Sequence, residues 1–271
     1  MLGTTKIYGC LADPINHVKA PTIFTSIFKN KNIDAVMIPI HLNDDNLENV
    51  VSSLKFIKNF KGMTVTIPHK TNITKLCDYL EPDAKFTGAV NWIKFDNDRN
   101  LIGDNFDGQG FVNGFIKQNY SLKNKNVCLF GAGGAAVSIG ASLVNEHIKS
   151  LKLINRNINK AIHLKNKIHS KSNLLKVEVF PESEYTLIDS DIIINATSLG
   201  LKQTDKLPFD VNNSSPNSVI ADIIMQPEET ELLKYAKSLG RSIHYGKYMI
   251  ESQIDLVCLL YTSPSPRDPI G

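Results

Sequence analysis

Short apolar runs separated by amphipathic stretches fill the second half of the chain. Each of the following runs is short enough for one buried strand: residues 126–130, 151–155, 177–180, 191–195, 219–223 and 242–245. Helical spacing of apolar residues occupies several of the segments between them, including one that ends near residue 170 and one over 228–239, and it resumes from Met249. Strands that alternate with helices predict a doubly wound parallel sheet of the α/β class.

The first hundred residues carry an α/β pattern of their own. Strands are predicted at 5–10, 34–40 and 62–67, followed by two short strands at 88–96 and 100–104. Helices are predicted from Pro21, over 45–60, and from Pro68-His69-Lys70 onward. A connecting helix over 107–118 then leads into the second half. The chain therefore divides into two α/β parts.

A glycine cluster joins the strand at 126–130 to a helix of small residues, and its sequence is Gly131-Ala132-Gly133-Gly134-Ala135-Ala136. Strand, turn and helix in this order are the context that a dinucleotide-binding fingerprint requires. Gly131 permits the tight turn, Gly133 lets a pyrophosphate approach the backbone, and Ala136 lets helix and strand pack closely. The free N–H groups at the helix start then face the anion. A plain structural turn is the alternative, and the strands and helices downstream favour the cofactor site.

The segment Asn155-Arg156-Asn157 closes the next predicted strand. In a site for NAD, an acidic residue about twenty positions beyond the glycines accepts a hydrogen bond from the ribose 2′-hydroxyl. This chain has Arg156 there, with Lys160 one turn further on, and two cations suit a 2′-phosphate. We therefore predict NADP as the cofactor. Two solvated surface cations are the alternative.

Composition narrows the class of protein. The 271 residues suffice for two modest domains, and 42% apolar residues, 21% charged residues and a net charge of +3 exclude disorder and strong nucleic-acid binding. No apolar run reaches bilayer length and residues 1–10 lack a secretory leader, so we expect a cytoplasmic protein without membrane or nucleic-acid partners. Cys10, Cys77, Cys128 and Cys258 lack metal-ligand spacing, and we expect reduced thiols and no metal site.

Several motifs in a fixed order are more specific than any one of them. They are Tyr8-Gly9-Cys10-Leu11-Ala12-Asp13-Pro14-Ile15, Thr64-Val65-Thr66-Ile67-Pro68-His69-Lys70, Gly88-Ala89-Val90-Asn91, Gly103-Asp104-Asn105-Phe106-Asp107-Gly108, Gly131 to Ala136, Asn155-Arg156, Asn195-Ala196-Thr197-Ser198-Leu199-Gly200 and Gln253. With these motifs the chain resembles the shikimate dehydrogenase family along nearly its whole length up to Val257.

The resemblance implies a two-domain α/β fold. An N-terminal α/β substrate-binding domain covers 1–106, a Rossmann-type NADP-binding domain covers 107–245, and a last helix over 246–257 returns to the first domain, with the active site in the cleft between the domains. Residues 258–271 are interpreted as a tail derived from a sequencing adapter, without functional information. The implied reaction is the reversible, NADP-dependent reduction of 3-dehydroshikimate or a related cyclic ketone, in chorismate and aromatic amino acid biosynthesis, by a monomer or homodimer.

Lys70 and Asp107 are the catalytic pair that the resemblance implies. Hydride delivery to a ketone builds negative charge on the oxygen, so a cation that donates a proton should lie beside that atom. Lys70 is predicted at the start of a helix, where the macrodipole disfavours a cation and so favours release of its proton. Asp107 would orient the ammonium. The alternatives are an exposed first-turn lysine and a simple helix N-cap.

The resemblance also assigns ligand contacts. Asn91 and Gln253 match positions that hydrogen-bond the ring hydroxyls of the substrate, and Thr66 matches another polar contact. Thr197 belongs to a cofactor-binding motif, and Gly246 lies where the loop before the last helix passes close to the nicotinamide. A turn residue, a helix-face glutamine and a strand threonine are the structural alternatives for the three substrate contacts.

The chain departs from the family at the position of two serines that bind the substrate carboxylate. Val18 and Ala20 stand there, between Pro14 and Pro21. A hydrogen bond to a charged group contributes about 1.5–3 kcal/mol, so the loss of two would cost about 3–6 kcal/mol, or roughly a hundredfold to ten-thousandfold in affinity. Asn16, His17 or Lys19 could still bind the carboxylate from a different angle.

Three more recognition positions have changed. Thr64 replaces an asparagine, Phe106 a threonine and Met225 a tyrosine, and these changes make the pocket more apolar. An intact catalytic pair beside altered recognition residues favours the same reaction type with a different ligand. The residues favour a related ligand that lacks the carboxylate of the family's substrate.

Two other classes of function stay open. A non-catalytic descendant could bind NADP and a small ligand, although such a protein has no need of both Lys70 and Asp107. A different Rossmann enzyme, such as a folate dehydrogenase, would share only the cofactor half, and the motifs before residue 110 argue against it.

Overall fold

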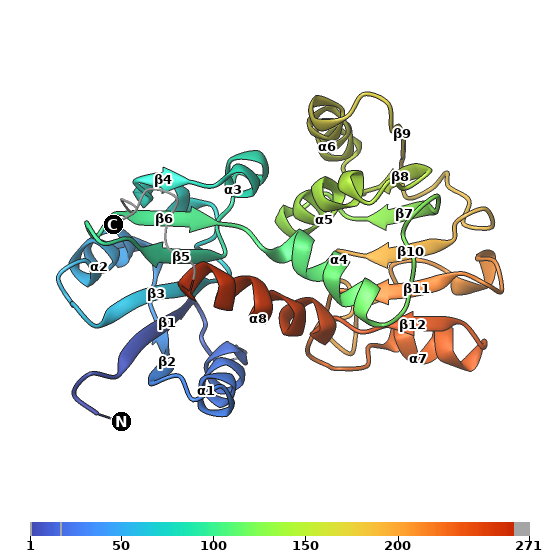
Figure 1. Cartoon of the computed structure of the whole chain (residues 1–271). Helices are drawn as coiled ribbons and strands as arrows, with labels where there is room; N and C mark the ends of the chain where they lie inside the picture. Colours follow the sequence, from blue (N-terminus) through green and yellow to red (C-terminus); the bar gives the residue numbers. More distant parts are fainter. Residues whose placement is uncertain (1, 17, 263–271) are drawn as a thin grey trace. The chain divides into compact units, whose positions relative to one another are not determined.

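The computed structural model describes residues 2–16 and 18–262, which fall into two compact units. The first unit holds the residues up to Phe106 together with those from Ile254 onward, and the second holds Asp107–Gln253 (Figure 1). Each unit has a six-stranded sheet with helices packed against it, so the predicted α/β class is confirmed.

The sheet of the first unit has the strand order β2-β1-β3-β5-β6-β4. Its strands are β1 (Lys6–Ala12), β2 (Ala35–His41), β3 (Phe60–Val65), β4 (Tyr79–Leu80), β5 (Trp92–Phe95) and β6 (Leu101–Asp104). The strands β2, β1 and β3 are parallel, whereas β5 runs antiparallel to both β3 and β6. Because side chains alternate along a strand, Tyr8 and Cys10 of β1 enter one core and Leu11 enters the core on the other face.

Helices cover both faces of this sheet. They are α1 (Ala20–Asn30), α2 (Leu47–Leu54) and α3 (Pro82–Thr87), with short 3-10 helices at Asp44–Asn46 and Asn72–Leu76. Phe24 and Phe28 of α1 pack with Tyr8 and Trp92, while α2 and α3 pack on the opposite core. The unpredicted helix α3 has two local signals, Pro82 at its first position and Gly88 beyond its end at φ 69°.

The helix predicted over 45–60 is too long. The α-helix ends at Leu54, because the carbonyl groups of Leu54, Lys55 and Ile57 accept hydrogen bonds from the guanidinium of Arg99. The guanidinium thus binds carbonyl groups that a continuing α-helix would pair with backbone N–H groups four residues later; the carbonyl groups of Leu54 and Ile57 also accept from the backbone N–H groups of Ile57 and Phe60 in turns.

The helix predicted from Pro68-His69-Lys70 is wrong. Residues 68–71 form turns, and only the 3-10 helix Asn72–Leu76 follows. The carbonyl of Lys70 would accept from residue 74 in an α-helix, but it accepts from the backbone N–H of Val90 over 2.8 Å. Lys70 therefore does not lie at the start of an α-helix, and the predicted effect of a helix macrodipole on its proton does not apply.

The sheet of the second unit is parallel throughout, with the order β12-β11-β10-β7-β8-β9. Its strands are β7 (Asn126–Phe130), β8 (Ser150–Ile154), β9 (Lys176–Phe180), β10 (Ile192–Asn195), β11 (Val219–Asp222) and β12 (Ser242–His244). These match the predicted strands within one or two residues. Strand order reverses between β7 and β10, and ligands of such sheets bind outside the carboxyl ends of the strands at this reversal.

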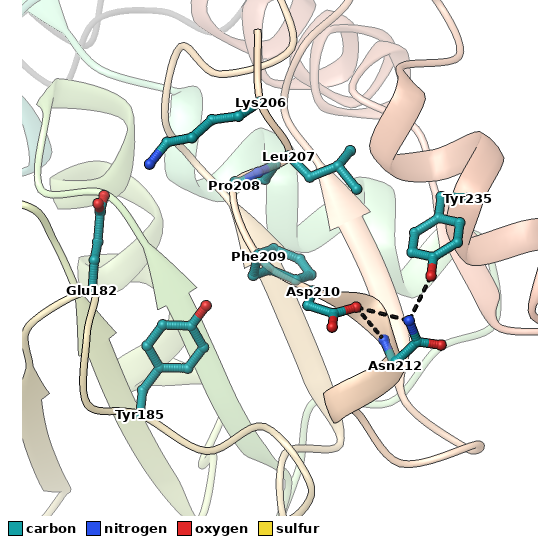
Figure 2. A pocket seen from close by; sticks show the side chains of 9 residues that line it. All are labelled: Glu182, Tyr185, Lys206, Leu207, Pro208, Phe209, Asp210, Asn212 and Tyr235. Carbon is teal, nitrogen blue, oxygen red and sulfur yellow. Dashed lines mark hydrogen bonds between the residues drawn. The ribbon is translucent and has the colours of Figure 1, made fainter.

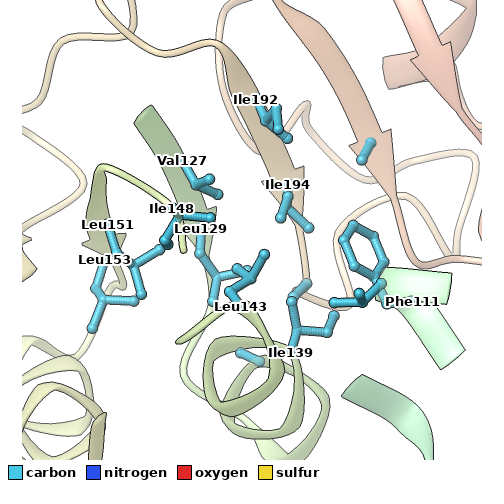
Figure 3. Packing of buried hydrophobic residues seen from close by; sticks show 14 of the residues in the cluster. Phe111, Val127, Leu129, Ile139, Leu143, Ile148, Leu151, Leu153, Ile192 and Ile194 are labelled. Carbon is cyan, nitrogen blue, oxygen red and sulfur yellow. The ribbon is translucent and has the colours of Figure 1, made fainter. Parts of the chain in front are cut away.

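The two faces of this sheet are covered differently. The helices are α4 (Asp107–Lys117), α5 (Gly134–Asn145), α6 (Ile158–Lys171), α7 (Glu231–Ser238) and α8 (Lys247–Thr262), with a 3-10 helix at Val211–Asn213. Figure 3 shows Ile139 and Leu143 of α5 packed among Val127, Leu129 and Ile194, in a core that α4 and α6 complete. The opposite core combines α7 with irregular segments that connect β9 to β10 and β10 to β11.

Helix α8 is shared by both units. Its part up to Gln253 belongs to the second unit, while Ile254 and Val257 pack in the first unit against the cluster that contains Tyr8 and Phe24. The predicted return of the last helix to the first domain is confirmed. The tail predicted from residue 258 lies in α8 as far as Thr262, and residues 263–271 lie outside the described residues.

Candidate active site

A pocket of about 320 Å³ opens at the carboxyl ends of β7, β8 and β10, beside the reversal in strand order. Its lining consists of Gly131, Ala132, Gly133, Asn155, Arg156, Glu182, Ala196, Thr197, Ser198, Leu199 and Lys206. Six residues of this lining were predicted as cofactor contacts: Gly131, Ala132, Gly133, Asn155, Arg156 and Thr197. Gly134, Ala135 and Lys160 lie outside the lining.

The glycines of the cluster have different reasons to lack a side chain. Gly131 has φ 112°, and a Cβ atom there would lie 2.7 Å from the carbonyl oxygen of Ala196. A Cβ atom on Gly133 or Gly134 would meet no atom within 4 Å, so the protein leaves space in front of both. Since α5 begins at Gly134, its free N–H groups face this space, and the site fits the pyrophosphate of a dinucleotide.

Two cations, Arg156 and Lys206, line the pocket. Arg156 is exposed at the end of β8, beside Asn155, whose side-chain amide donates to the carbonyl of Asn157 over 2.7 Å. Lys206 comes from the connection between β10 and β11, and sequence reasoning missed it together with Glu182, which follows β9. No local pattern marks these two residues, because only the folded chain brings them to the pocket.

Thr197 is held rigidly after β10. Its hydroxyl donates to Oδ1 of Asn195 over 2.7 Å and accepts from the backbone N–H of Leu199 over 3.1 Å. Gly246 lies just before α8, where a Cβ atom would come within 2.6 Å of the backbone of Ile223. The protein itself therefore requires glycine at position 246.

A second pocket of about 520 Å³ shares Glu182 and Lys206 with the first. Figure 2 shows these two side chains extending toward each other at one end and Asn212 near Tyr235 at the other. The amide of Asn212 donates to Asp210 over 3.0 Å and to the hydroxyl of Tyr235. The two pockets thus share two charged lining residues of opposite sign, Glu182 and Lys206.

In the first unit, three predicted residues lie near one end of the sheet. Thr66 follows β3, and its carbonyl accepts from the backbone N–H of His69 over 3.0 Å. Half-buried Lys70 is tied by its own carbonyl to Val90, the neighbour of Asn91. The structure therefore brings Thr66, Lys70 and Asn91 together through backbone bonds.

Asn91 is buried, and part of its side chain is committed to the protein. Its Oδ1 accepts from the backbone N–H of Phe106 over 2.9 Å. The neighbouring strand β6 ends at Asp104, whose burial raises the pKa of its carboxyl group to about 6. This end of the unit therefore holds a carboxyl group that gains a proton more readily than an ordinary aspartate.

The departures at Val18, Ala20 and Phe106 converge on one apolar cluster. All three pack against buried residues that include Tyr8 and Trp92. Lys19 and Asn16 are exposed, and His17 lies outside the described residues. Val18 and Ala20, which stand where the family has serines, thus belong to the same apolar cluster as Phe106.

Asp107 and Gln253 meet in the second unit. Asp107 is the first residue of α4 and is buried, and its Oδ1 accepts from Nε2 of Gln253 over 3.3 Å. Gln253 lies on α8, far away in sequence. Asp107 and Gln253, the first and last residues of the second unit in sequence, are thus joined by a hydrogen bond.

Two other kinds of site are absent from the part of the chain that the structure describes. Within residues 2–16 and 18–262, no three His, Cys, Asp or Glu side chains are grouped so that they could hold a metal ion. None of the helices in this part of the chain is long and apolar enough to cross a membrane. Burial raises the pKa of both Cys10 and Cys77 to about 12, so their thiolates are scarce near neutral pH.

Sequence models of one family match most of the chain. The model described as shikimate dehydrogenase substrate binding domain matches residues 10–93, and the model described as shikimate / quinate 5-dehydrogenase matches residues 115–223. The shikimate dehydrogenase (NADP(+)) of Methanosphaera stadtmanae is 34% identical over 268 residues, which cover 97% of this chain and 94% of that protein.

Solved structures agree with these matches. A crystal structure of a shikimate dehydrogenase in complex with NADP+ has a TM-score of 0.90 and 30% identity, with 97% of this chain and 91% of that chain covered. The ligand-free 5-ketofructose reductase of a Gluconobacter species has a TM-score of 0.87 and 28% identity, with 95% and 93% covered.

Proposed function

The chain belongs to the shikimate dehydrogenase family, and from this premise we propose that it interconverts 3-dehydroshikimate, or a related cyclic ketone, and the corresponding secondary alcohol. It is an NADP-dependent oxidoreductase that acts on a CH–OH group. The observation that carries the proposal is the pocket at the carboxyl ends of β7, β8 and β10, with its glycine turn and Arg156.

The proposed roles follow from the charge that the reaction develops. NADPH, when bound, supplies a hydride to the carbonyl carbon of the substrate. Lys70 donates a proton to the oxygen, and its positive charge stabilises the negative charge that builds there. Asp107 orients the ammonium and takes part in moving the proton. The bond from Gln253 supports this role, because it fixes the orientation of the Asp107 carboxylate.

For the cofactor, we propose that Arg156 and Lys206 both attract phosphate groups. Both cations line the pocket, and a 2′-phosphate distinguishes NADP from NAD. Arg156→Ala should weaken NADP binding much more than NAD binding. Lys160 stays a candidate for the second cation, and a comparison of Lys206→Ala with Lys160→Ala decides between them: the true contact loses NADP affinity, while the other variant binds as the wild type does.

A second substrate class has its own support. Val18, Ala20 and Phe106 make one apolar face where the family binds a carboxylate, and a structural relative of similar fold is named for the reduction of 5-ketofructose, a sugar. We therefore keep a ligand without the carboxylate as the second candidate within the same reaction class.

One assay tests both candidates. Purified protein is mixed with NADP and, in turn, shikimate, quinate and analogues that lack the carboxylate, while absorbance of the reduced nicotinamide is followed. Turnover that disappears in Lys70→Ala and in Asp107→Asn supports the proposed roles. The preferred substrate then assigns the ligand class, and Val18→Ser/Ala20→Ser should raise the preference for shikimate if the carboxylate contact has been lost.

Two outcomes of this assay would contradict the proposal. NADP binding without turnover on any alcohol of the panel would refute the proposed reaction and favour a non-catalytic binding protein. Full activity in Lys70→Ala would refute only the role proposed for Lys70 and leave the proposed reaction standing.

A further inference from the structure

His69 is fully buried beside Lys70, and both of its ring nitrogens face hydrogen-bond acceptors. Nδ1 lies 2.7 Å from Oδ1 of Asp44, and Nε2 lies 2.7 Å from the carbonyl oxygen of Leu42. A backbone carbonyl only accepts, so Nε2 must carry a proton. An ionised carboxylate also only accepts, and the Asp44 side chain is 45% exposed to solvent, where the ionised form is favoured.

We propose that His69 is a buried imidazolium, and that Asp44 and His69 together are positioning residues that hold the turn carrying Lys70. The inference rests on the proposed function, because it takes Lys70 as the proton donor. Neither Asp44 nor His69 is assigned a contact with the substrate or the cofactor.

The contacts of Asp44 show how the turn is held. While Oδ1 faces His69, Oδ2 accepts from Nδ2 of Asn72 over 3.1 Å. One carboxylate thus ties the residue before Lys70 and the second residue after it. On the other side, the backbone N–H of Val90 holds the carbonyl of Lys70. The backbone of Lys70 is therefore fixed from two sides, and its side chain extends from a clamped turn.

The choice of a charged ring at this position has a physical reason. A buried cation is unfavourable unless it is paired and hydrogen-bonded, and His69 has both kinds of partner. An apolar ring would fill the same volume without that requirement, but it would leave the Asp44 and Leu42 oxygens unbridged. The imidazolium links the loop after β2 to the turn after β3 through two short bonds to charged or polar oxygens.

The kinetic test compares two neighbouring carboxylates. Asp44→Asn keeps the shape and removes the charge that pairs with His69. Asp45→Asn is the matched control, since Asp45 is exposed on the same 3-10 helix and makes the identical charge change one residue away. We expect Asp44→Asn to lower kcat by tenfold or more and to change KM by less than about threefold, because placement of the proton donor affects the chemical step. Asp45→Asn should match the wild type.

A double-mutant cycle separates positioning from general destabilisation. His69→Gln can still donate to the Leu42 carbonyl but cannot bridge to Asp44, and we expect the double variant to lose no more kcat than the worse single variant. Additive losses would mean that the two residues act separately and would overturn the proposal. Equal losses in kcat and in the folded fraction, measured by circular dichroism, would assign a structural role only and would also overturn it.

Nuclear magnetic resonance tests the charge state directly. With ¹⁵N-labelled histidine at pH 7, both ring nitrogens of His69, identified by their absence in His69→Gln, should show the shifts of protonated nitrogens. In Asp44→Asn, Nδ1 should lose its proton. A neutral ring in the wild type would overturn the proposal even if the enzyme is active.

The two proposals fail in different ways. Absence of turnover by the wild type on the whole substrate panel refutes the proposed function. Normal wild-type turnover with equal kcat in Asp44→Asn and Asp45→Asn refutes only the positioning role.

Discussion

The side-chain amide of Asn195 in β10 donates a hydrogen bond to Oδ1 of Asp222 in β11 over 3.1 Å, and both residues are fully buried. The same carboxyl group also accepts from the backbone N–H of Ile224 and from the hydroxyl of Thr230. Burial outweighs these bonds and raises the pKa of Asp222 to about 6.

This raised pKa predicts a loss of stability with rising pH. Below the unfolded pKa of about 4 the carboxyl group is protonated in both states, and between about 4 and about 6 only the folded state keeps the proton. The contribution of Asp222 to the free energy of unfolding therefore falls as the pH rises through this range, by roughly 3 kcal/mol. Urea denaturation of the wild type and Asp222→Asn from pH 4 to 7 should show this change as the difference between the two curves. A difference that is independent of pH would contradict it.

For His244 we expect the free energy of unfolding to depend on pH in the opposite direction. Its ring is buried among the rings of Phe111, Phe115 and Tyr248, and within the described residues neither ring nitrogen has a hydrogen-bond partner. Burial lowers the pKa of His244 to about 4. As the pH falls from about 6.5 to about 4, the unfolded state binds a proton that the folded state excludes, and roughly 3 kcal/mol of stability is lost.

His244→Phe should remove that loss, because phenylalanine fills the aromatic cluster without ring nitrogens. The measurement is the free energy of unfolding at pH 4.5 and pH 7, and the gain over the wild type should be larger at pH 4.5. Equal gains at both values would mean that protonation of His244 does not limit acid stability. Because Asp222 and His244 act with opposite signs, the wild-type profile alone cannot separate them.

Arg99 should be one of the most sensitive surface positions. Its guanidinium donates over 2.8–3.0 Å to the carbonyl groups of Leu54, Lys55, Ile57 and Phe60. The planar fork of arginine reaches several acceptors that one ammonium cannot. We expect Arg99→Lys to lose about 2–4 kcal/mol of the free energy of unfolding, nearly as much as Arg99→Ala, since each lost bond to a charged group contributes about 1.5–3 kcal/mol and the losses are not additive. A loss below about 1 kcal/mol in urea denaturation would show that the carbonyl groups are satisfied without the fork.

Two glycines of the cofactor pocket should respond differently to the same methyl group. Gly131→Ala is expected to destabilise the fold by about 2 kcal/mol or more, because φ is 112° and the Ala196 carbonyl blocks the new Cβ atom. Gly133→Ala meets no protein atom and should keep the wild-type melting temperature, yet it should weaken NADP binding at least tenfold if the pyrophosphate lies against it. Calorimetric titration with NADP measures the second effect, and unchanged affinity would contradict the placement of the cofactor.

The second unit was largely predictable because its central strands β7, β10 and β11 are nearly continuous apolar runs. Strands β7 and β10 are covered on both faces, so Val127 and Leu129 enter one core while Cys128 and Phe130 enter the other, and no polar residue interrupts the pattern. The glycine turn was equally visible, since the φ of Gly131 is a local requirement.

Long-range bonds explain what the sequence could not predict. The segment after Pro68 has helical spacing, but Asp44 binds the side chains of His69 and Asn72, and the backbone N–H of Val90 binds the Lys70 carbonyl, so the segment forms turns. Arg99 ends α2 from 45 residues away in the chain, at Leu54. Glu182 and Lys206 lie in irregular connections, where no periodicity marks a residue that lines a pocket. Local patterns therefore predicted lining residues such as Gly131 and Arg156, whereas Glu182 and Lys206 reach the pocket only through the fold.

The division of α8 between the units makes the first unit discontinuous in sequence. Val257 is buried with Tyr8, Phe24 and Trp92, so the hydrophobic core of the first unit includes a residue that follows the whole second unit in the chain. A fragment that stops at Phe106 would therefore leave part of that core uncovered, whereas residues 107–253 form one uninterrupted stretch.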